Sequence, residues 1–247
     1  MRSYSADLHV HSVLSPCGDW SMSPASILAR ARAVGLDLIA IMDHNMAENG
    51  AALRAAAAGS SVSVLYGMEL ETAEEVHVLC LFDSLSDALA WQEVVYRHLP
   101  EVANDPDRFS DQVVVDWEDN VVRTEMRLLA NATDIPLLDA FAMVEARGGL
   151  PIPAHVDRRA HSLVSQLGFP PSELRLAAVE LSPFAPERFM EQQAWQRPIP
   201  AVAFSDAHFI HEVGRRRTIF RVANPTVEEI RRALRAADGR SAWISDR

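Results

Sequence analysis

The sequence predicts an α/β fold, a single barrel in which buried strands alternate with helices. Three observations indicate this fold. Short apolar runs alternate with helical patterns over most of the 247 residues, the length suits one such barrel, and polar residues able to bind metals follow several of the runs. Alternation of this kind is typical of βαβ units and a largely parallel sheet. We therefore expect one domain over residues 1–247.

The first third of the chain predicts regular strand and helix units. Residues 6–10 form the first expected strand. Ser23-Pro24 begins a helix that runs to Val34 and stops at Gly35, because proline is tolerated in the first turn of a helix and glycine is favoured after the last. The next expected elements are a strand at 36–42, a helix at 51–58, and strands at 62–70 and 76–82.

The middle of the chain is less regular and predicts an insertion on the barrel. A helix is expected at 87–99, and residues 112–122 have the pattern of a β-hairpin that turns at Asp119-Asn120. We expect this helix and hairpin to form an insertion at about 84–133. Alternation then resumes with a helix at 136–148, strands at 150–155, 177–181 and 199–204, and a helix at 226–237.

Charge and composition exclude several classes of protein. A formal net charge of −11 argues against extensive binding of duplex nucleic acid, and no apolar run reaches the roughly 20 residues of a membrane span. The two cysteines, Cys17 and Cys80, are too few for a disulfide framework, so we expect a cytoplasmic protein. All 23 basic residues are arginine, which excludes Schiff-base chemistry and a carbamylated-lysine metal bridge.

Histidines and carboxylates occur at the ends of the expected strands. His9 and His11 are two apart on a strand, so their side chains point the same way and can reach one metal ion. Asp206 and His208 form a second pair of this spacing. In a barrel the carboxyl ends of the strands converge on one face, which predicts a shared site. The other residues of this kind are Asp43, His44, Glu69 and His155, together with His77, which comes early in its strand.

The number and type of these side chains predict the chemistry. Eight or nine candidate ligands exceed what one ion can use, so we expect two or three divalent ions of zinc, manganese or iron. Ions about 4 Å apart can hold the attacking and leaving oxygens of a displacement at phosphorus and can lower the pKa of a bound water. The sequence therefore predicts hydrolysis of a phosphate monoester or diester by metal-activated water.

The ordered motifs DLHVH, MDHN, GMEL, EVH, PAH and SDAH resemble those of the PHP (polymerase and histidinol phosphatase) family, from about residue 6 to residue 208. The resemblance implies a distorted (β/α)7 barrel of the TIM-like kind and a trinuclear metal centre that hydrolyses phosphate esters. It also implies cytoplasmic bacterial enzymes, including histidinol phosphatases, nucleotide and oligonucleotide phosphatases and proofreading domains of polymerases. The implied ligands are His9, His11, Glu69 and Asp206 for the first ion, Glu69, His77 and His155 for the second, and His44 and His208 for the third.

The chain departs from the family pattern at one ligand of the third ion. The family usually has a histidine or aspartate shortly after the H-x-H pair, whereas this chain has Ser15-Pro16-Cys17-Gly18-Asp19. Cys17 matches the spacing of the histidine version, and a thiolate is a good zinc ligand. Asp19 would serve if the loop bulges. We expect Cys17 to be the ligand.

Three residues are candidates for roles in the reaction itself. Arg158 could bind a substrate phosphate through its guanidinium, or it could form only a surface ion pair. Asp206 or a site histidine such as His208 could protonate the leaving group, and the sequence leaves open which. Asp43 is expected to orient a neighbouring ligand rather than to bind a metal.

Two other functions and several substrates stay open. An amidohydrolase-type barrel also begins with H-x-H, but without a lysine only its mononuclear form is possible. The second alternative is a non-catalytic PHP-like metal-binding module associated with nucleic-acid enzymes. The substrate could be a small phosphorylated metabolite such as histidinol phosphate, a nucleotide or a short oligonucleotide, since the acidic charge favours short substrates over duplex DNA.

Overall fold

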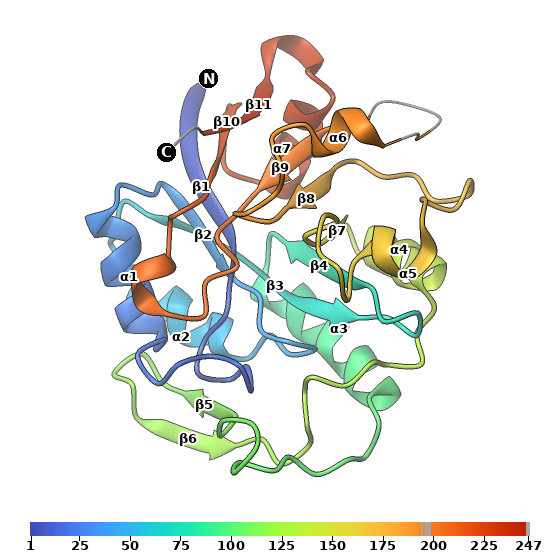
Figure 1. The fold of residues 1–247 in the computed structure, drawn as a ribbon. Coiled ribbons are helices and arrows are strands. Elements are labelled where there is room, and N and C mark those ends of the chain that lie inside the picture. The colour runs from blue at the N-terminus through green and yellow to red at the C-terminus, as the bar shows by residue number, and fades with distance from the viewer. Residues whose placement is uncertain (194, 196–198, 246–247) are drawn as a thin grey trace.

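The computed structural model describes residues 1–193, 195 and 199–245. Its centre is a seven-stranded sheet with the order β11-β10-β1-β2-β3-β4-β7 (Figure 1). These strands are β1 (Arg2–Val10), β2 (Leu38–Ile41), β3 (Ser63–Glu71), β4 (His77–Phe82), β7 (Leu150–Pro153), β10 (Thr218–Val222) and β11 (Ser241–Ile244). Two short sheets contain β5 (Val113–Val115) with β6 (Val121–Thr124), and β8 (Val179–Leu181) with β9 (Ala201–Ala203).

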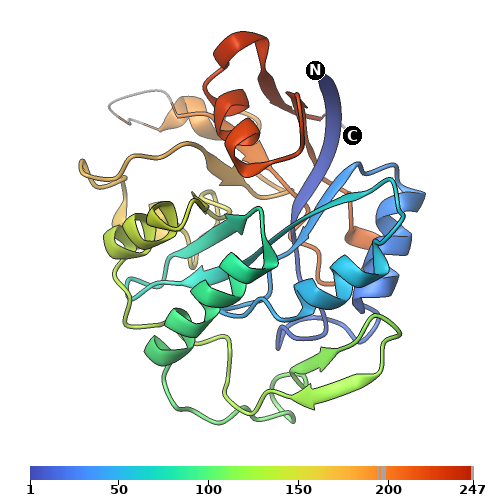
Figure 2. The same cartoon turned by 180° about the vertical axis from the view of Figure 1, so that it is seen from behind.

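Helices cover the strands. Figure 2 shows the helices α2 and α3 in front of the sheet. The helices are α1 (Pro24–Ala33), α2 (Asn49–Ala56), α3 (Leu85–His98), α4 (Leu137–Ala146), α5 (Leu163–Leu167), α6 (Phe189–Gln192) and α7 (Val227–Leu234), with short 3-10 turns η1 (Ile210–Glu212) and η2 (Ala237–Gly239). Helix α1 begins where the sequence predicts, because the Ser23 side chain accepts a hydrogen bond from the Ser26 N–H. Among the described residues, no helix combines the length and hydropathy needed to cross a membrane.

The sheet is mixed rather than largely parallel. Strands β1, β2 and β3 run parallel, as expected, but β4 pairs antiparallel with both β3 and β7. The prediction of a largely parallel sheet is wrong here because residues 72–76 are too few for the crossover that a parallel neighbour needs. Strand β10 also pairs antiparallel with β1 and β11.

The sheet curls so that strands late in the chain return to β1. Strands β8 and β9 pair in parallel. Beside β7, the Val156 N–H donates to the Glu180 carbonyl over 2.9 Å, and Ala207, after β9, forms a parallel bridge with Val10 at the end of β1. The result is the α/β fold with a curled, barrel-like sheet that the sequence predicts, while the count of seven βα units stays a prediction.

The segment expected as an insertion, residues 84–133, contains two different parts. Helix α3 packs Trp91 and Val95 into the same apolar cluster as Val78 and Cys80 of β4. The β5–β6 hairpin instead lies outside the large sheet, at the bottom of Figure 1. The hairpin forms where the sequence predicts it, with Val115 paired to Val121 across the turn. The boundaries of the insertion and the single-domain organisation stay predictions.

Candidate metal centre

Imidazole and carboxylate side chains from distant parts of the chain meet at one edge of the curled sheet. The cluster contains His9, His11, Cys17, His44, Glu69, His77, His155, Asp206 and His208, which are all the metal ligands that the sequence suggests. His77 is the first residue of β4, yet it lies with the strand ends because β4 is antiparallel and pairs it with Glu71 at the end of β3. All except Cys17 and His208 are buried.

The carboxylate of Glu69 lies at the centre of the cluster. Its two oxygens have imidazole nitrogens within 3.4 Å, namely those of His9, His11, His44, His77 and His155. The shortest of these contacts joins Oε1 to His77 Nδ1 at 2.9 Å. Burial would raise the pKa of Glu69, but His77 and His9 hold it well below the usual value, so the group is ionised. A carboxylate placed in this way can bridge two cations.

His9 and His11 direct lone pairs toward each other. Their Nε2 atoms are 3.2 Å apart. The other nitrogen of each ring donates a hydrogen bond, His9 Nδ1 to Glu180 at 3.0 Å and His11 Nδ1 to Ser15 Oγ at 2.9 Å, so in the neutral form of either ring Nε2 carries the lone pair. Asp206 Oδ1 lies 3.1 Å from His11 Nε2 and 3.3 Å from His9 Nε2. Lone pairs that converge beside a carboxylate oxygen form a site for a cation.

Asp43 fixes the loop that follows β1, the orienting role that its sequence position predicts. It accepts hydrogen bonds from the Ser12 N–H and hydroxyl at 2.6 Å each, and from the Ser15 hydroxyl at 2.7 Å. Because the Ser15 hydroxyl gives its one proton to Asp43, its oxygen accepts from His11 Nδ1. Burial raises the pKa of Asp43 to about 6, although these hydrogen bonds act in the opposite direction.

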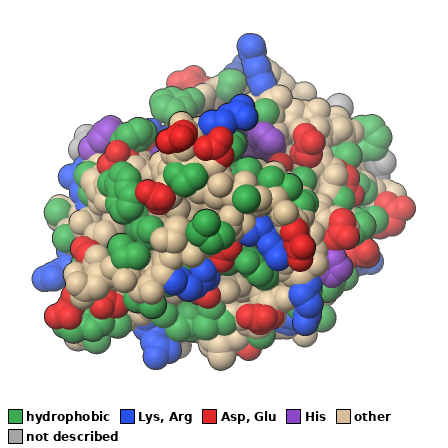
Figure 3. Space-filling model, turned by 90° about the horizontal axis from the view of Figure 1, so that it is seen from below, with side chains coloured by type: hydrophobic (Ala, Val, Ile, Leu, Met, Phe, Trp, Pro, Cys, Tyr) green, Lys and Arg blue, Asp and Glu red, His purple; other side chains and the backbone are tan. Residues whose placement is uncertain are grey.

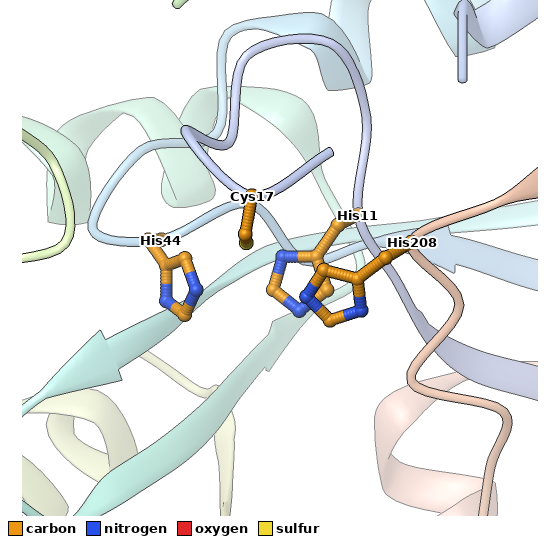
Figure 4. A group of neighbouring side chains, drawn as sticks. All are labelled: His11, Cys17, His44 and His208. Atoms are coloured by element: carbon orange, nitrogen blue, oxygen red, sulfur yellow. The ribbon is translucent and has the colours of Figure 1, made fainter. Parts of the chain in front are cut away.

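A second group of ligand-type side chains contains no carboxylate. Its members each place one donor atom within 4.8 Å of the others (Figure 4), and they are His11, Cys17, His44 and His208. His208 donates from Nδ1 to the Asp206 carbonyl over 2.9 Å, which leaves its Nε2 free for the group. Burial and the nearby His208 lower the pKa of His11 to about 4, so this ring is neutral and able to bind a metal.

The loop after β1 places Cys17, and not Asp19, in this group. The Asp19 carboxylate instead accepts hydrogen bonds from the N–H and hydroxyl of Ser21, at 2.9 and 2.6 Å. Gly18 allows the tight turn between them, because a β-carbon there would lie 2.3 Å from the Ser12 carbonyl oxygen. The geometry therefore favours the cysteine over the aspartate as a ligand.

Two buried nitrogens in the cluster make no hydrogen bond within the part of the chain that the structure describes. They are Nδ1 of His44 and Nδ1 of His155. Buried polar atoms rarely lack a partner unless an ion or water satisfies them. Burial also lowers the pKa of His44 well below its ordinary value, so its ring is neutral. The neutral rings of His11 and His44, the ionised Glu69 and the two nitrogens without a hydrogen bond together fit divalent metal ions.

Arg158 lies between the cluster and solvent. Its guanidinium donates to Asp206 Oδ2, while the other oxygen of Asp206 faces His9 and His11. The Arg158 side chain is 39% exposed. From this position it can reach both the cluster and an anion that enters from solvent.

Glu180, on β8, also belongs to the site, although no motif in the sequence predicts it. This residue is 1% exposed, and its carboxylate accepts hydrogen bonds from His9 Nδ1 and from the His155 N–H, all at 3.0 Å. The available signal was an acid inside the apolar run 177–181, because a buried carboxylate needs partners. Glu180 thus orients two ligand-type histidines.

Glu71 and His161 extend the cluster at its edge. His161 Nδ1 and Glu71 Oε1 are 3.0 Å apart, and the His161 ring stacks on that of His77 with centroids 4.9 Å apart. The sequence gives no role to either residue. With His77 they form a further group of ligand-type side chains whose donor atoms lie within 4.8 Å of one another.

Two family models match the sequence. The PHP domain model matches residues 7–133, and a PHP-associated model matches residues 189–238. No curated protein matches the sequence.

Several solved structures share the fold. A lesion-specific endonuclease from Pyrococcus furiosus, endonuclease Q, superposes with a TM-score of 0.68 and 21% identity, over 98% of this chain and 58% of the other. A complex of endonuclease Q with a 27-mer duplex that carries an abasic lesion gives 0.67 and 20%, over 97% and 58%. This chain therefore spans little more than half the length of endonuclease Q.

Two other structures match most of both chains. A protein from Bifidobacterium adolescentis, assigned as a metal-dependent phosphoesterase, has a TM-score of 0.56 and 17% identity over 83% of this chain and 87% of the other. An amidohydrolase from Chromobacterium violaceum, solved with sulfate and without metal, has 0.56 and 20% over 95% and 99%. At these identities the likeness concerns the fold.

Proposed function

Since the chain belongs to the PHP domain family, we propose that it is a metal-dependent phosphoesterase that hydrolyses a phosphate monoester or diester. The convergence of the His9 and His11 lone pairs, 3.2 Å apart beside Asp206 and Glu69, carries this proposal. Burial lowers the pKa of His9, but Glu180, Asp206 and Glu69 raise it well above its ordinary value. The carboxylates therefore favour positive charge at this point, which a metal ion would supply. The distorted (β/α)7 barrel, with its active face at the strand ends, is part of the same proposal.

The donor atoms divide into three neighbouring ion positions. We infer that the first is held by His9, His11, Glu69 and Asp206, the second by Glu69, His77 and His155, and the third by Cys17, His44 and His208. Glu69 would join the first two, because its oxygens face both sets of imidazoles. Imidazole with carboxylate suits zinc, manganese or iron. When bound, such ions polarise a phosphoryl oxygen and lower the pKa of water.

Partly exposed side chains beside the cluster would bind the substrate phosphate and supply the proton for the leaving group. Arg158 would bind a non-bridging phosphate oxygen and offset the charge that develops there. Burial would raise the pKa of Asp206, but His9 and His11 hold it well below its usual value, so Asp206 is ionised and would not supply the proton for the leaving oxygen. His208, whose side chain is 23% exposed, would supply it when its Nε2 is not bound to metal. In that case His208 would be the proton donor to a substrate held by Arg158.

Exposed aromatic side chains favour a nucleotide or short oligonucleotide as the substrate. The Asp19 N–H donates to the His208 carbonyl over 2.9 Å. Trp20 directly follows Asp19 and Phe209 directly follows His208, so each aromatic residue is next to a residue of this hydrogen-bonded pair beside the cluster. They are 60% and 48% exposed, and such aromatic faces stack nucleobases. A net charge of −11 favours a short substrate. On the face in Figure 3, arginines are scattered among acidic side chains.

Removal of metal tests the function. The purified chain, stripped with a chelator and dialysed, is expected to lose hydrolysis of p-nitrophenyl phosphate, nucleotides and short oligonucleotides, and to regain it with manganese or zinc. Full activity of a stripped chain that mass spectrometry shows to be metal-free would refute the proposal. Hydrolysis of amides but not phosphate esters would indicate the amidohydrolase alternative. Stoichiometric metal without any turnover would indicate a non-catalytic module.

Glu180→Gln is expected to weaken metal binding by roughly 10–100-fold, the usual cost of losing a partner that orients a metal ligand. The amide oxygen could still accept from His9 Nδ1 and the His155 N–H, as Oε2 does, but the amide carries no negative charge and would place an NH2 donor where Oε1 now faces His9 Nδ1. Titration of the stripped protein with zinc against a chelating dye measures the change. Glu145→Gln, at a half-exposed position on α4, is the matched control. Wild-type affinity in Glu180→Gln would show that Glu180 has no orienting role.

A further inference from the structure

We propose that Cys17 makes the third ion position selective for zinc, beside two positions that contain carboxylate and accept harder ions such as manganese. The inference rests on the proposed function, because it assumes that the cluster holds metal. It adds that a single centre would contain two kinds of ion, distinguished by their ligands.

The composition of the donor sets carries the inference. The group of Cys17 with His11, His44 and His208 has one sulfur and three nitrogen donors within 4.8 Å of one another, and no carboxylate. Figure 4 shows the Cys17 side chain pointing between His44 on one side and the other two imidazoles on the opposite side. The neighbouring sets contain Glu69 or Asp206.

Ligand chemistry connects these sets to different metals. Thiolate selects zinc over manganese, whereas carboxylate oxygen suits manganese and other hard ions. Zinc takes four ligands in a tetrahedron, and a catalytic zinc uses three protein ligands with one position open. Cys17, His44 and His208 supply three when His11 serves the first position. A thiolate at this point therefore changes which ion is preferred.

The position of the thiol is enforced by the surrounding loop. The Gly18 N–H donates to the Ser15 carbonyl over 2.9 Å, and the Ser15 hydroxyl is bound to Asp43. On the far side, the Asp19 N–H donates to the His208 carbonyl. The loop that carries the sulfur is thus bonded on both sides to segments that carry the histidines, so Cys17 is held at the group.

Cobalt substitution tests the sulfur ligand directly. Cobalt(II) bound to a thiolate gives a sulfur-to-metal charge-transfer band in the near ultraviolet. The stripped full chain, loaded with cobalt, is expected to show this band, and Cys17→Ser and Cys17→Asp are expected to lack it. Cys80→Ala is the matched control, because Cys80 is the other cysteine and lies in the apolar core. It should keep the band.

Metal competition tests the selectivity. After equilibration with zinc and an excess of manganese, the wild-type chain is expected to retain one zinc ion that Cys17→Asp exchanges for manganese, as measured by elemental mass spectrometry. Bound cobalt without the band in the wild type, a band that persists in Cys17→Ser, or equal zinc-to-manganese ratios in wild type and Cys17→Asp would each overturn the inference. If the wild type still hydrolyses phosphate esters with metal, only the selectivity fails. If it binds no metal, the proposed function fails too.

Discussion

Glu69→Gln is expected to lose phosphoesterase activity by more than the roughly 10–100-fold that follows loss of an outer partner of a metal ligand. Glu69 contacts five imidazoles and would join two ion positions. A neutral amide has one oxygen acceptor and cannot balance two cations. Both kcat/KM for p-nitrophenyl phosphate and the number of ions per chain should fall.

A second buried glutamate, Glu125, provides the control for the general effect of neutralising a buried carboxylate. Glu125 is 5% exposed, and its partners are the side chains of Arg123 and Tyr96 and the Arg127 N–H, which lie outside the cluster. Glu125→Gln is therefore expected to change thermal stability while leaving the ions per folded chain unchanged. If Glu69→Gln kept wild-type activity and metal content, Glu69 would not be a bridging ligand.

Arg158→Ala is expected to reduce kcat/KM by about 10²–10³, the range seen when one group that stabilises developing charge is removed. The metal content should stay at the wild-type level, since Asp206 keeps its contacts with His9 and His11. Arg158→Lys should recover part of the activity, because a lysine restores the charge but not the planar fork of donors. Steady-state kinetics with elemental analysis of each variant measures these effects.

The neighbouring arginine provides the control for charge. Arg159 is exposed, so Arg159→Ala removes the same charge one residue away and should leave kcat/KM near the wild-type value. Unchanged kinetics in Arg158→Ala would show that Arg158 forms only a surface ion pair and does not bind the substrate. A parallel loss of metal and activity would instead indicate that Arg158 only supports Asp206.

Local patterns in the sequence predicted most strands and helices, but not β10 and β11, and they singled out nearly all the ligand-type side chains that meet in the cluster. Spacing accounts for this success. His9 and His11 are two apart on a strand and therefore share a face. The ends of successive strands must lie at one edge, and this brings Glu69, His155 and Asp206 together. These constraints act between residues near one another in sequence, or follow from the fold class, so periodicity is enough to predict them.

The other features of the site depend on packing between segments that are far apart in the sequence. His77 comes early in its strand and reaches the cluster only because β4 is antiparallel. The bond between His9 and Glu180 spans 171 residues, and nothing near either residue encodes it. The choice between Cys17 and Asp19 likewise depends on how the loop turns against Ser12 and Asp43. Such contacts arise only when separate segments pack, because their energies depend on partners that no local pattern specifies.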